Sequence, residues 1–350
     1  MADPPPAHSL RLQKFLHAGP ARHLGRLSNL RLGIVKVFIV TPENPGGTSG
    51  NSITATRWAG ILRALGHEVA LGTEWQDQKC NLLVALHARR SYSSIDRFRT
   101  AYADHAVIVA LTGTDLYHDL QVSHEARRSL VLATRIIALQ NLAGAELDAN
   151  DRDKLRIVYQ SAKPPGQTER PRDDCFEVSV LAHLRDVKDP LRAASASTAL
   201  PSQSRIAIHH AGKAMDPKWK ALAVEESRIN PRYHWLGEQT HEQAIRLLAR
   251  SRLTVLSSLM EGGSSTIAEA VVCGVPILCS KISGNAGMLG PDYPGFFPVE
   301  GTAELTALLR RAESDANFLL TLRSAMEVFR SRFTPEREAE SWMKLLQELA

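Results

Sequence analysis

Short apolar runs, hydrophobic at nearly every position, recur along the chain, and each is followed by a polar loop and a helical pattern. The first of them reads IVKVFIV at residues 34–40. A run without polar alternation is typical of a parallel strand that is buried on both faces. Strands that alternate with helices indicate a doubly wound α/β sheet. The predicted strands lie at 34–40, 67–71, 81–86, 106–111, 135–139 and 155–159, and then at 176–182, 205–210, 232–236, 253–257 and 275–279.

The alternation is interrupted between residues 160 and 174, where the sequence QSAKPPGQTERPRDD combines three prolines with many charges. That composition is typical of a linker, and a chain of 350 residues exceeds the usual size of a single core. We therefore predict two Rossmann-like domains that face a central cleft. The predicted parts are a basic, flexible arm at 1–32, an N-terminal domain at 33–160, a linker at 161–174, a C-terminal domain at 175–334, and a helix at 335–350 that crosses back to the N-terminal domain.

Composition argues against several other classes of protein. The net charge of +5 comes without a dense block of Lys and Arg, which fits anionic small molecules and gives no reason to expect a nucleic acid partner. The four cysteines form no C-x-x-C pair, so we expect neither a zinc knuckle nor a disulfide framework, and a cytoplasmic location fits. No run approaches the roughly 18 apolar residues of a membrane span.

The richest single stretch follows the predicted strand at 253–257 and reads LMEGGSSTIAEA at residues 259–270. Its glycines and hydroxyls precede a helix, whose N-terminus offers free backbone N–H groups to a phosphate or a sugar hydroxyl. Glu261 and Glu269 flank this loop, and an ionised carboxylate accepts two hydrogen bonds from vicinal hydroxyls. A capping box, formed by Thr266 and Glu269, explains the same spacing equally well.

Three loops of the N-terminal half follow predicted strands and carry polar groups. They contain Gly46, Gly47, Gly50 and Asn51; His87, Arg89 and Arg90; and Thr112, Gly113, Thr114 and Asp115. Ligands of open parallel sheets lie beyond the carboxyl ends of the strands, which is where these loops are expected. The glycine loop does not satisfy the G-x-G-x-x-G fingerprint, so nicotinamide binding with Glu74 as ribose acceptor is disfavoured. Ordinary flexible or solvated loops are the alternative interpretation.

Positive charge follows the predicted strand at 176–182, where Arg185 and Lys188 lie in the loop HLRDVKDP. Facing the Glu261 loop, these two cations would stabilise the charge on a departing nucleoside diphosphate; by themselves they fit a solvated turn equally well. A metal ion commonly does this through a D-x-D element. The one literal match, Asp151-Arg152-Asp153, lies in the very polar segment DANDRDK, so we predict a reaction without metal or other cofactor.

With these residues in view, the C-terminal half resembles the GT-B glycosyltransferases of family 4, whose hallmark is two glutamates separated by seven residues. The resemblance implies that Glu269 holds the nucleotide ribose and that Glu261 and the glycine loop contact the donor sugar. It places Lys188 on the family's diphosphate-binding Lys, while His183 occupies the Arg position and Arg185 takes its role. The implied donor site comprises Arg185, Lys188, Leu236, Gly237, Glu261, Gly262, Gly263, Ser264, Ser265, Thr266 and Glu269.

A narrower resemblance runs from residue 39 onward. The stretches TPENPGGTSGNS, LLVALHARRS, VALTGTDLY, IVYQSA and LRDVKDP are similar to the selenosugar synthases of selenoneine biosynthesis. Those enzymes join selenophosphate to a UDP-sugar, typically UDP-N-acetylglucosamine, and release a 1-selenosugar, UDP and phosphate. An anionic acceptor needs mainly a cationic pocket, so we expect the N-terminal loops to bind it and assign catalytic roles to His87, Arg185, Lys188 and Glu261. The predicted acceptor site comprises Gly47, Gly50, Asn51, His87, Arg89, Arg90, Thr112, Gly113, Thr114 and Asp115.

Two other functions stay open at this stage. One is a family 4 transferase with a hydroxyl acceptor, and the other is a catalytically silent nucleotide-sugar-binding protein. The sequence leaves open retention or inversion at the anomeric carbon, since family 4 resemblance implies retention whereas a far-face attack inverts.

Overall fold

The computed structural model describes residues 33–47, 49–167 and 169–350. The arm predicted at residues 1–32 lies outside the described residues. Two parallel six-stranded sheets carry the rest of the chain, and they confirm the predicted α/β class with two Rossmann-like halves.

The first sheet has the strand order β2-β1-β3-β4-β5-β6, and every pairing in it is parallel. Its core strands are apolar on both faces, as in β3, where all five residues of LLVAL are buried. Its strands are β1 (Lys36–Val40), β2 (Glu68–Gly72), β3 (Leu82–Leu86), β4 (Ala106–Leu111), β5 (Arg135–Ala138) and β6 (Leu155–Ile157). Its helices are α2 (Gly50–Ala64), α3 (Tyr92–Ala101), α4 (Leu120–Val122), α5 (His124–Leu132) and α6 (Ala149–Lys154), with the π-helical turn η1 (Asp115–Asp119) and the 3-10 turn η2 (Asn141–Glu146).

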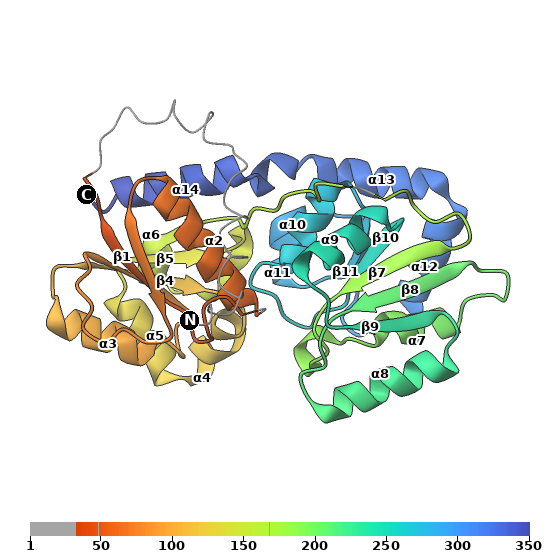
Figure 1. Cartoon of the computed structure of the whole chain (residues 1–350), viewed down its shortest axis with the longest axis horizontal. Coiled ribbons are helices and arrows are strands. Elements are labelled where there is room, and N and C mark those ends of the chain that lie inside the picture. The colour runs from red at the N-terminus through yellow and green to blue at the C-terminus, as the bar shows by residue number, and fades with distance from the viewer. Residues whose placement is uncertain (1–32, 48, 168) are drawn as a thin grey trace, which may run out of the picture. The chain divides into compact units, whose positions relative to one another are not determined.

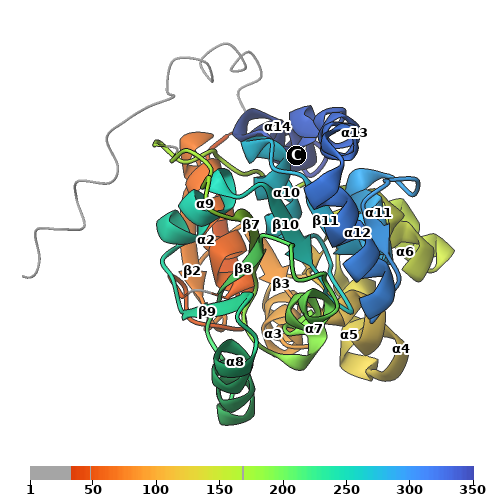
Figure 2. The same ribbon diagram turned by 90° about the vertical axis from the view of Figure 1, so that its right-hand side faces the viewer.

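The second sheet has the order β12-β11-β10-β7-β8-β9 and is again parallel throughout, and the labels of β9, β8, β7, β10 and β11 follow one another across Figure 2. Its strands are β7 (Phe176–Leu181), β8 (Ile206–Ala211), β9 (Tyr233–Gly237), β10 (Leu253–Leu256), β11 (Ile277–Ser280) and β12 (Phe296–Phe297). Its helices are α7 (Arg192–Thr198), α8 (Pro217–Ile229), α9 (His241–Arg250), α10 (Ser265–Cys273), α11 (Ser283–Leu289), α12 (Thr302–Ser314), α13 (Ala316–Glu327) and α14 (Pro335–Gln347), with the 3-10 turns η3 (Asp186–Lys188) and η4 (Arg330–Phe333).

Each sheet has one point where the winding direction of the chain reverses. In the first sheet this point lies between β1 and β3, and in the second between β7 and β10. Loops at the carboxyl ends of the strands diverge at such a point and leave room for a ligand. The predicted acceptor residues Gly47 to Asn51 and His87 to Arg90 follow β1 and β3, while Lys188 and Glu261 follow β7 and β10.

Two elements of the C-terminal half escape prediction, α11 and β12. The sequence SGNAGML of α11 contains two glycines, which disfavour a helix. Both glycines are required by close neighbours, because a Cβ at Gly284 would overlap the carbonyl of Glu261 and a Cβ at Gly287 would overlap the Gln140 side chain. Helix α9 begins with a capping box, in which Thr240 and Gln243 are bonded reciprocally.

The C-terminal helix α14 packs against α2 of the first sheet, and Figure 1 shows the two helices side by side. The Trp342 ring of α14 meets the Trp58 ring of α2 edge to face, with ring centroids 5.0 Å apart. Both rings are fully buried. The end of the chain is therefore tied to the N-terminal half by an aromatic contact.

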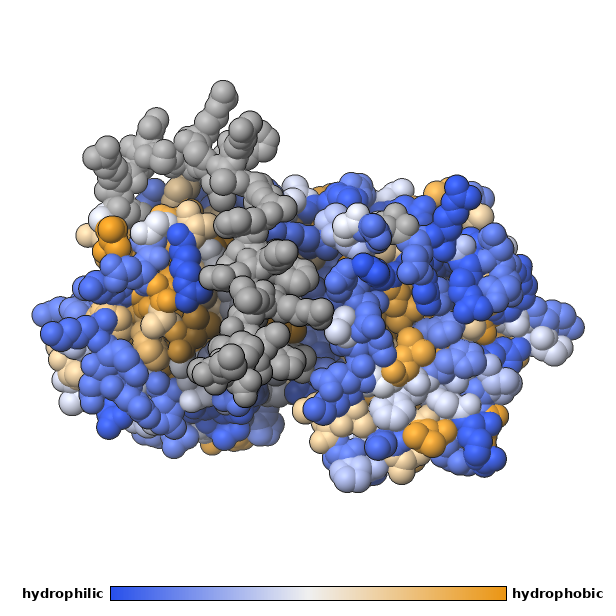
Figure 3. Space-filling model, viewed as in Figure 1, coloured by the Kyte–Doolittle hydropathy of each residue, from blue (hydrophilic) through white to orange (hydrophobic). Residues whose placement is uncertain are grey.

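Hydrophilic residues dominate the face drawn in Figure 3 outside its grey atoms, with smaller hydrophobic areas between them. Of the helices in the described ranges, none combines the length and apolar character needed to cross a bilayer.

Candidate functional site

Lys188 and Glu261 meet at the carboxyl ends of β7 and β10. Lys188 Nζ lies 2.5 Å from Glu261 Oε1, and the side chains are only 18% and 10% exposed. Ser258 Oγ donates to the same Oε1 at 2.6 Å. The two loops are also joined through their backbones, because Leu259 N donates to the carbonyl of Val187 at 2.9 Å. The structure thus brings together two predicted donor-site residues that are 73 positions apart.

The glycine loop after Glu261 lies directly against the N-terminal half. A Cβ at Gly262 would overlap the backbone of Thr112 and would lie 2.6 Å from Gly113 N, and a Cβ at Gly263 would overlap the Leu139 side chain. Side chains at these positions would push the two loops apart. The predicted donor loop and the predicted acceptor turn therefore touch each other.

Glu269 lies one turn into α10, and it does not form the capping box that its spacing also allowed. The N-cap of α10 is Ser264, without a side-chain cap, and Thr266 Oγ1 donates instead to the carbonyl of Leu181 at 3.3 Å. Burial raises the pKa of Glu269 to about 8, and the positive charge of Arg57 opposes this shift. The side chain of Glu269 is 12% exposed, and its Oε1 lies 3.8 Å from His241 Nδ1.

The other predicted donor residues occupy the same edge of the second sheet. Arg185 is exposed and has no ion-pair partner within the described ranges, so its charge is free for an anion. Leu236 and Gly237 end β9, where Gly237 has φ 71° and its carbonyl accepts from Gly212 N at 2.9 Å. Ser265 is exposed at the first position of α10. Ser264 N donates to Met288 Sδ.

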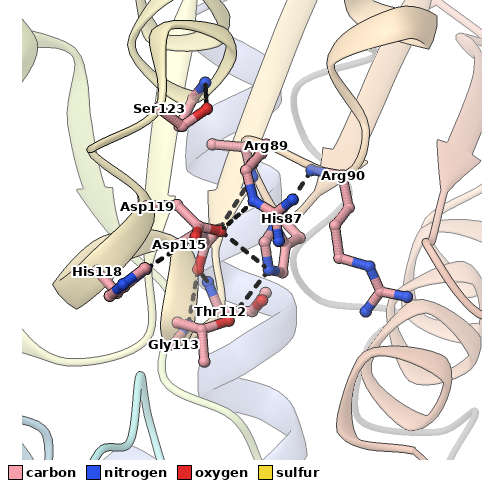
Figure 4. A network of polar contacts seen from close by, with 12 residues as sticks. His87, Arg89, Arg90, Thr112, Gly113, Asp115, His118, Asp119 and Ser123 are labelled. Atoms are coloured by element: carbon pink, nitrogen blue, oxygen red, sulfur yellow. Dashed lines mark hydrogen bonds and ion pairs between the residues drawn. The ribbon is translucent and has the colours of Figure 1, made fainter. Parts of the chain in front are cut away.

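On the acceptor side, His87 has the left-handed φ of 72° although it is not a glycine. Such strain is often found at functional sites. His87 Nε2 lies 3.1 Å from Thr114 Oγ1 and 3.7 Å from Asp119 Oδ2. Arg89 Nε lies 2.9 Å from the same Oδ2, and His118 Nδ1 lies 3.2 Å from Oδ1, so one imidazole, one guanidinium and a second imidazole surround this carboxylate (Figure 4).

Asp119 itself is nearly buried. Burial alone would raise its pKa, but the hydrogen bonds and charges of Arg89, His118 and His87 bring the pKa of Asp119 below the usual value. It is therefore ionised at neutral pH and orients both the imidazole of His87 and the guanidinium of Arg89.

Asp115 has a structural role in the turn after β4. Its Oδ1 accepts from Thr112 N at 2.9 Å and Gly113 N at 2.8 Å, and its Oδ2 accepts from Ala88 N at 3.0 Å. The carboxylate is fully buried. Asp115 thus fixes the turn against the loop after β3, and its oxygens are already used.

Arg90 points away from Asp119 in Figure 4 and pairs instead with Glu43, 2.6 Å from Nη1 to Oε1. Burial alone would raise the pKa of Glu43, but the hydrogen bonds of Ser49 and Arg90 and the charges of Arg90 and His87 lower it. Ser49 is also the N-cap of α2, which begins with Gly50 and Asn51. Gly46, with φ 86°, and Gly47 lie exposed in the same loop.

The sequence prediction missed Asp119, Glu43 and Ser258. Asp119 follows the predicted turn TGTD by four positions, and Glu43 and Ser258 each precede a predicted residue by three. Asp119 and Glu43 lie far along the chain from Arg89 and Arg90, with which they pair, so no local signal in the sequence reveals them.

Among the described residues, no group of three or more His, Cys, Asp or Glu side chains is placed to hold an ion. The Asp151-Arg152-Asp153 element lies within α6, where Asp151 pairs with Lys154 at 3.4 Å and Asp153 is exposed. Residues two apart on a helix do not face each other.

Residues 167–327 match the family model described as "Glycosyl transferases group 1". Among solved structures, the chain is similar to the sucrose-phosphate synthase of Thermosynechococcus elongatus, with a TM-score of 0.71, 15% identity, and coverage of 91% of this chain and 99% of that one. HepE of Anabaena, in complex with UDP and glucose, has a TM-score of 0.71 and 16% identity, and the match covers 90% of this chain and 100% of HepE. A glycosyltransferase from Rickettsia africae has a TM-score of 0.68 and 13% identity, and the match covers 91% of this chain and 99% of that one. Residues 167–327 therefore form a glycosyl transferase group 1 domain, in a chain that has the GT-B fold of the glycosyltransferases.

Proposed function

We propose that the chain transfers a sugar from a UDP-sugar, UDP-N-acetylglucosamine in the first instance, and that its acceptor is selenophosphate. On the donor side the proposal is supported by the pairing of Lys188 with Glu261 at the switch point of the second sheet. It is also supported by HepE, whose structures contain UDP and UDP-glucose. In this assignment Glu269 accepts the ribose hydroxyls, and Arg185 and Lys188 hold the diphosphate.

One observation carries the acceptor side, namely the contact between the loop of Gly262 and the turn of Thr112 and Gly113. The sequence stretches that resemble selenosugar synthases include this turn and the loop of His87 and Arg89. Since His87 Nε2 lies 3.1 Å from Thr114 Oγ1, an acceptor held by these two loops would be adjacent to the donor sugar.

The reaction then has two steps. A selenium lone pair of selenophosphate forms the C–Se bond at the anomeric carbon while the C–O bond to UDP breaks, and Arg185 and Lys188 stabilise the departing charge. Selenophosphate is already an anionic nucleophile, so this step requires little general base catalysis. Water then attacks phosphorus, the Se–P bond breaks, and the selenosugar and phosphate separate. We assign the positioning of that water to His87, whose Nε2 lies 3.7 Å from Asp119 Oδ2.

A second candidate is a hydroxyl acceptor, and the ion pairs of the acceptor side favour it. Arg89 is paired with Asp119 and Arg90 with Glu43, which reduces the net positive charge available to an anion. A hydroxyl would need a general base, and an imidazole next to a carboxylate can provide one.

A mass-spectrometric assay separates the candidates. The protein is incubated with UDP-N-acetylglucosamine and selenophosphate, and in parallel with phosphate plus simple sugars. A selenosugar or its phosphate, formed together with UDP, is the expected result. If UDP is released at the same rate without selenophosphate, the reaction is instead transfer to a hydroxyl acceptor or hydrolysis of the UDP-sugar.

A further inference from the structure

Glu261, the carboxylate that the proposed function assigns to the donor sugar, is held through one of its oxygens only. Lys188 Nζ at 2.5 Å and Ser258 Oγ at 2.6 Å both bind Oε1. Oε2 accepts no hydrogen bond in the part of the chain that the structure describes. The lone pairs of Oε1 are thus occupied, and Oε2 is the atom left for a hydroxyl of the sugar.

Ser258 belongs to a buried polar network behind this carboxylate. The carbonyl of Ser258 accepts from Ser280 Oγ at 2.5 Å. Asn285, in α11, donates from Nδ2 to the carbonyl of Ser280 at 2.9 Å and to its Oγ at 3.3 Å. All three residues are fully buried. The network therefore runs without solvent from α11 to the Glu261 carboxylate.

The chemistry of the acceptors fixes the direction of each bond in this network. A carbonyl or an ionised carboxylate can only accept, so the Ser258 hydroxyl donates to Glu261 and the Ser280 hydroxyl donates to the Ser258 carbonyl. For the same reason the Asn285 amide presents its NH2 group to Ser280. Ser258 cannot turn its hydroxyl away from Glu261 without leaving a buried donor unpaired, which is costly.

The helix α11, which carries Asn285, is itself held between Glu261 and the N-terminal half. A Cβ at Gly284 would overlap the carbonyl of Glu261, and a Cβ at Gly287 would overlap the Gln140 side chain. Gln140 is fully buried, and both polar atoms of its amide are hydrogen-bonded within the N-terminal half. The amide thus gives α11 a fixed surface to pack on.

We propose that Ser258 is a positioning residue of the donor-sugar site, which fixes the Glu261 carboxylate so that Oε2 faces the sugar, and that Ser280 and Asn285 hold Ser258 for this purpose. Through Gln140, the N-terminal half takes part in placing the helix that carries Asn285. The inference rests on the proposed role of Glu261 beside the donor sugar, and it adds which oxygen binds the sugar and which hydroxyl orients it.

The test is a double-mutant cycle of Ser258→Ala and Glu261→Ala. UDP release from UDP-N-acetylglucosamine is measured with selenophosphate and with water alone, and UDP affinity is measured by calorimetry. Ser251→Ala is the matched control, because Ser251 is also buried in the C-terminal half and its hydroxyl donates to the carbonyl of Leu247 at 2.7 Å. Ser280→Ala removes the support of Ser258 without removing a partner of Glu261.

We expect Ser258→Ala to lower kcat about tenfold, as the loss of one hydrogen bond to an ionised group would. UDP affinity should stay within about twofold, because the ion pair of Lys188 and Glu261 is retained. Ser280→Ala should lower kcat less, and Ser251→Ala should leave it unchanged. In the Glu261→Ala background, Ser258→Ala should have no further effect, because its hydroxyl acts through the carboxylate.

The outcomes separate this inference from the function on which it rests. A residue with a merely structural role would lower kcat equally in both backgrounds, so equal decreases would overturn the inference alone, as would an unchanged kcat in Ser258→Ala beside an impaired Glu261→Ala. Undiminished turnover by Glu261→Ala would overturn the proposed role of Glu261 and the inference with it. If selenophosphate does not accelerate UDP release, the proposed acceptor is wrong, and the cycle measured with water still decides the role of Ser258.

Discussion

The pair of Lys188 and Glu261 permits a sharp prediction about the donor site. If Lys188 holds the diphosphate and Glu261 the donor sugar, the two substitutions Lys188→Met and Glu261→Gln must affect UDP in opposite directions. Lys188→Met removes a cation and leaves the Glu261 charge unbalanced beside the diphosphate. Glu261→Gln releases Lys188 from its carboxylate and increases the positive charge that UDP meets.

The size of the effect follows from the geometry. The two atoms are 2.5 Å apart and the side chains are 18% and 10% exposed, so the pair is largely but not wholly desolvated. Removing one partner of a fully buried pair costs about 3–5 kcal/mol, and a charge-assisted hydrogen bond contributes about 1.5–3 kcal/mol. Taking about 2 kcal/mol for this partly hydrated pair, Lys188→Met should weaken UDP about thirtyfold. Glu261→Gln should leave UDP affinity equal or up to about tenfold stronger, while it lowers turnover.

Calorimetry with UDP and initial rates with the UDP-sugar supply the two readouts. Lys220→Met, on the exposed face of α8, controls for loss of a surface cation. Equal weakening of UDP by Lys188→Met and Glu261→Gln would refute the assignment of these residues to different parts of the donor.

Three further outcomes are expected. Glu269→Ala should weaken UDP binding, whereas His87→Ala should spare it and lower turnover with selenophosphate; equal loss of UDP affinity would show that donor and acceptor faces are wrongly divided. Burial raises the pKa of Glu269 from its ordinary 4.5 to about 8, so above pH 4.5 this carboxyl ionises more readily in the unfolded chain than in the folded one. The folded protein therefore loses stability as the pH rises from 4.5, and the loss is complete above pH 8. Glu269→Gln should therefore stabilise the ligand-free protein by about 2 kcal/mol at pH 8.5 and hardly at pH 4.5, as thermal unfolding at both pH values would show. Gly262→Ala should cost about 1–3 kcal/mol, because its Cβ overlaps the Thr112 backbone; Gly60→Ala, with open space around it, is the control, and equal melting temperatures of the two variants would contradict the contact.

The strands were predictable because their environment imposes a simple rule on the sequence. A strand buried on both faces must be apolar at nearly every position, as LLVAL in β3 is. The helix α11 follows no such rule. Its two glycines lower helix propensity, and the reason for them is the approach of Glu261 and Gln140 from remote parts of the chain. A single sequence carries no trace of that approach.

The same distinction applies to the site. Lys188 and Glu261 were selected by residue type and by their places after strands, but their direct contact depends on the order of strands in the sheet, in which β7 and β10 are neighbours. Asp119 and Glu43 were missed because acids are common in surface loops. Only burial and the positions of Arg89 and Arg90 reveal that these two acids hold the cations of the acceptor side.

Those ion pairs bear on how an anion could bind there. Arg89 pairs with Asp119 through Nε, and in the residues that the structure describes its two terminal nitrogens have no hydrogen-bond partner. A guanidinium has five N–H donors, so one carboxylate orients Arg89 without exhausting it. Because the side chain is already fixed, less conformational entropy is lost when a second anion binds. If the acceptor is phosphate-like, the pairing with Asp119 lowers the net charge that it meets but leaves the terminal nitrogens of Arg89 to bind it, whereas a neutral hydroxyl would gain nothing from that charge. Replacing Arg89 thus separates the two acceptor classes: it weakens a selenophosphate and leaves a sugar hydroxyl nearly unaffected.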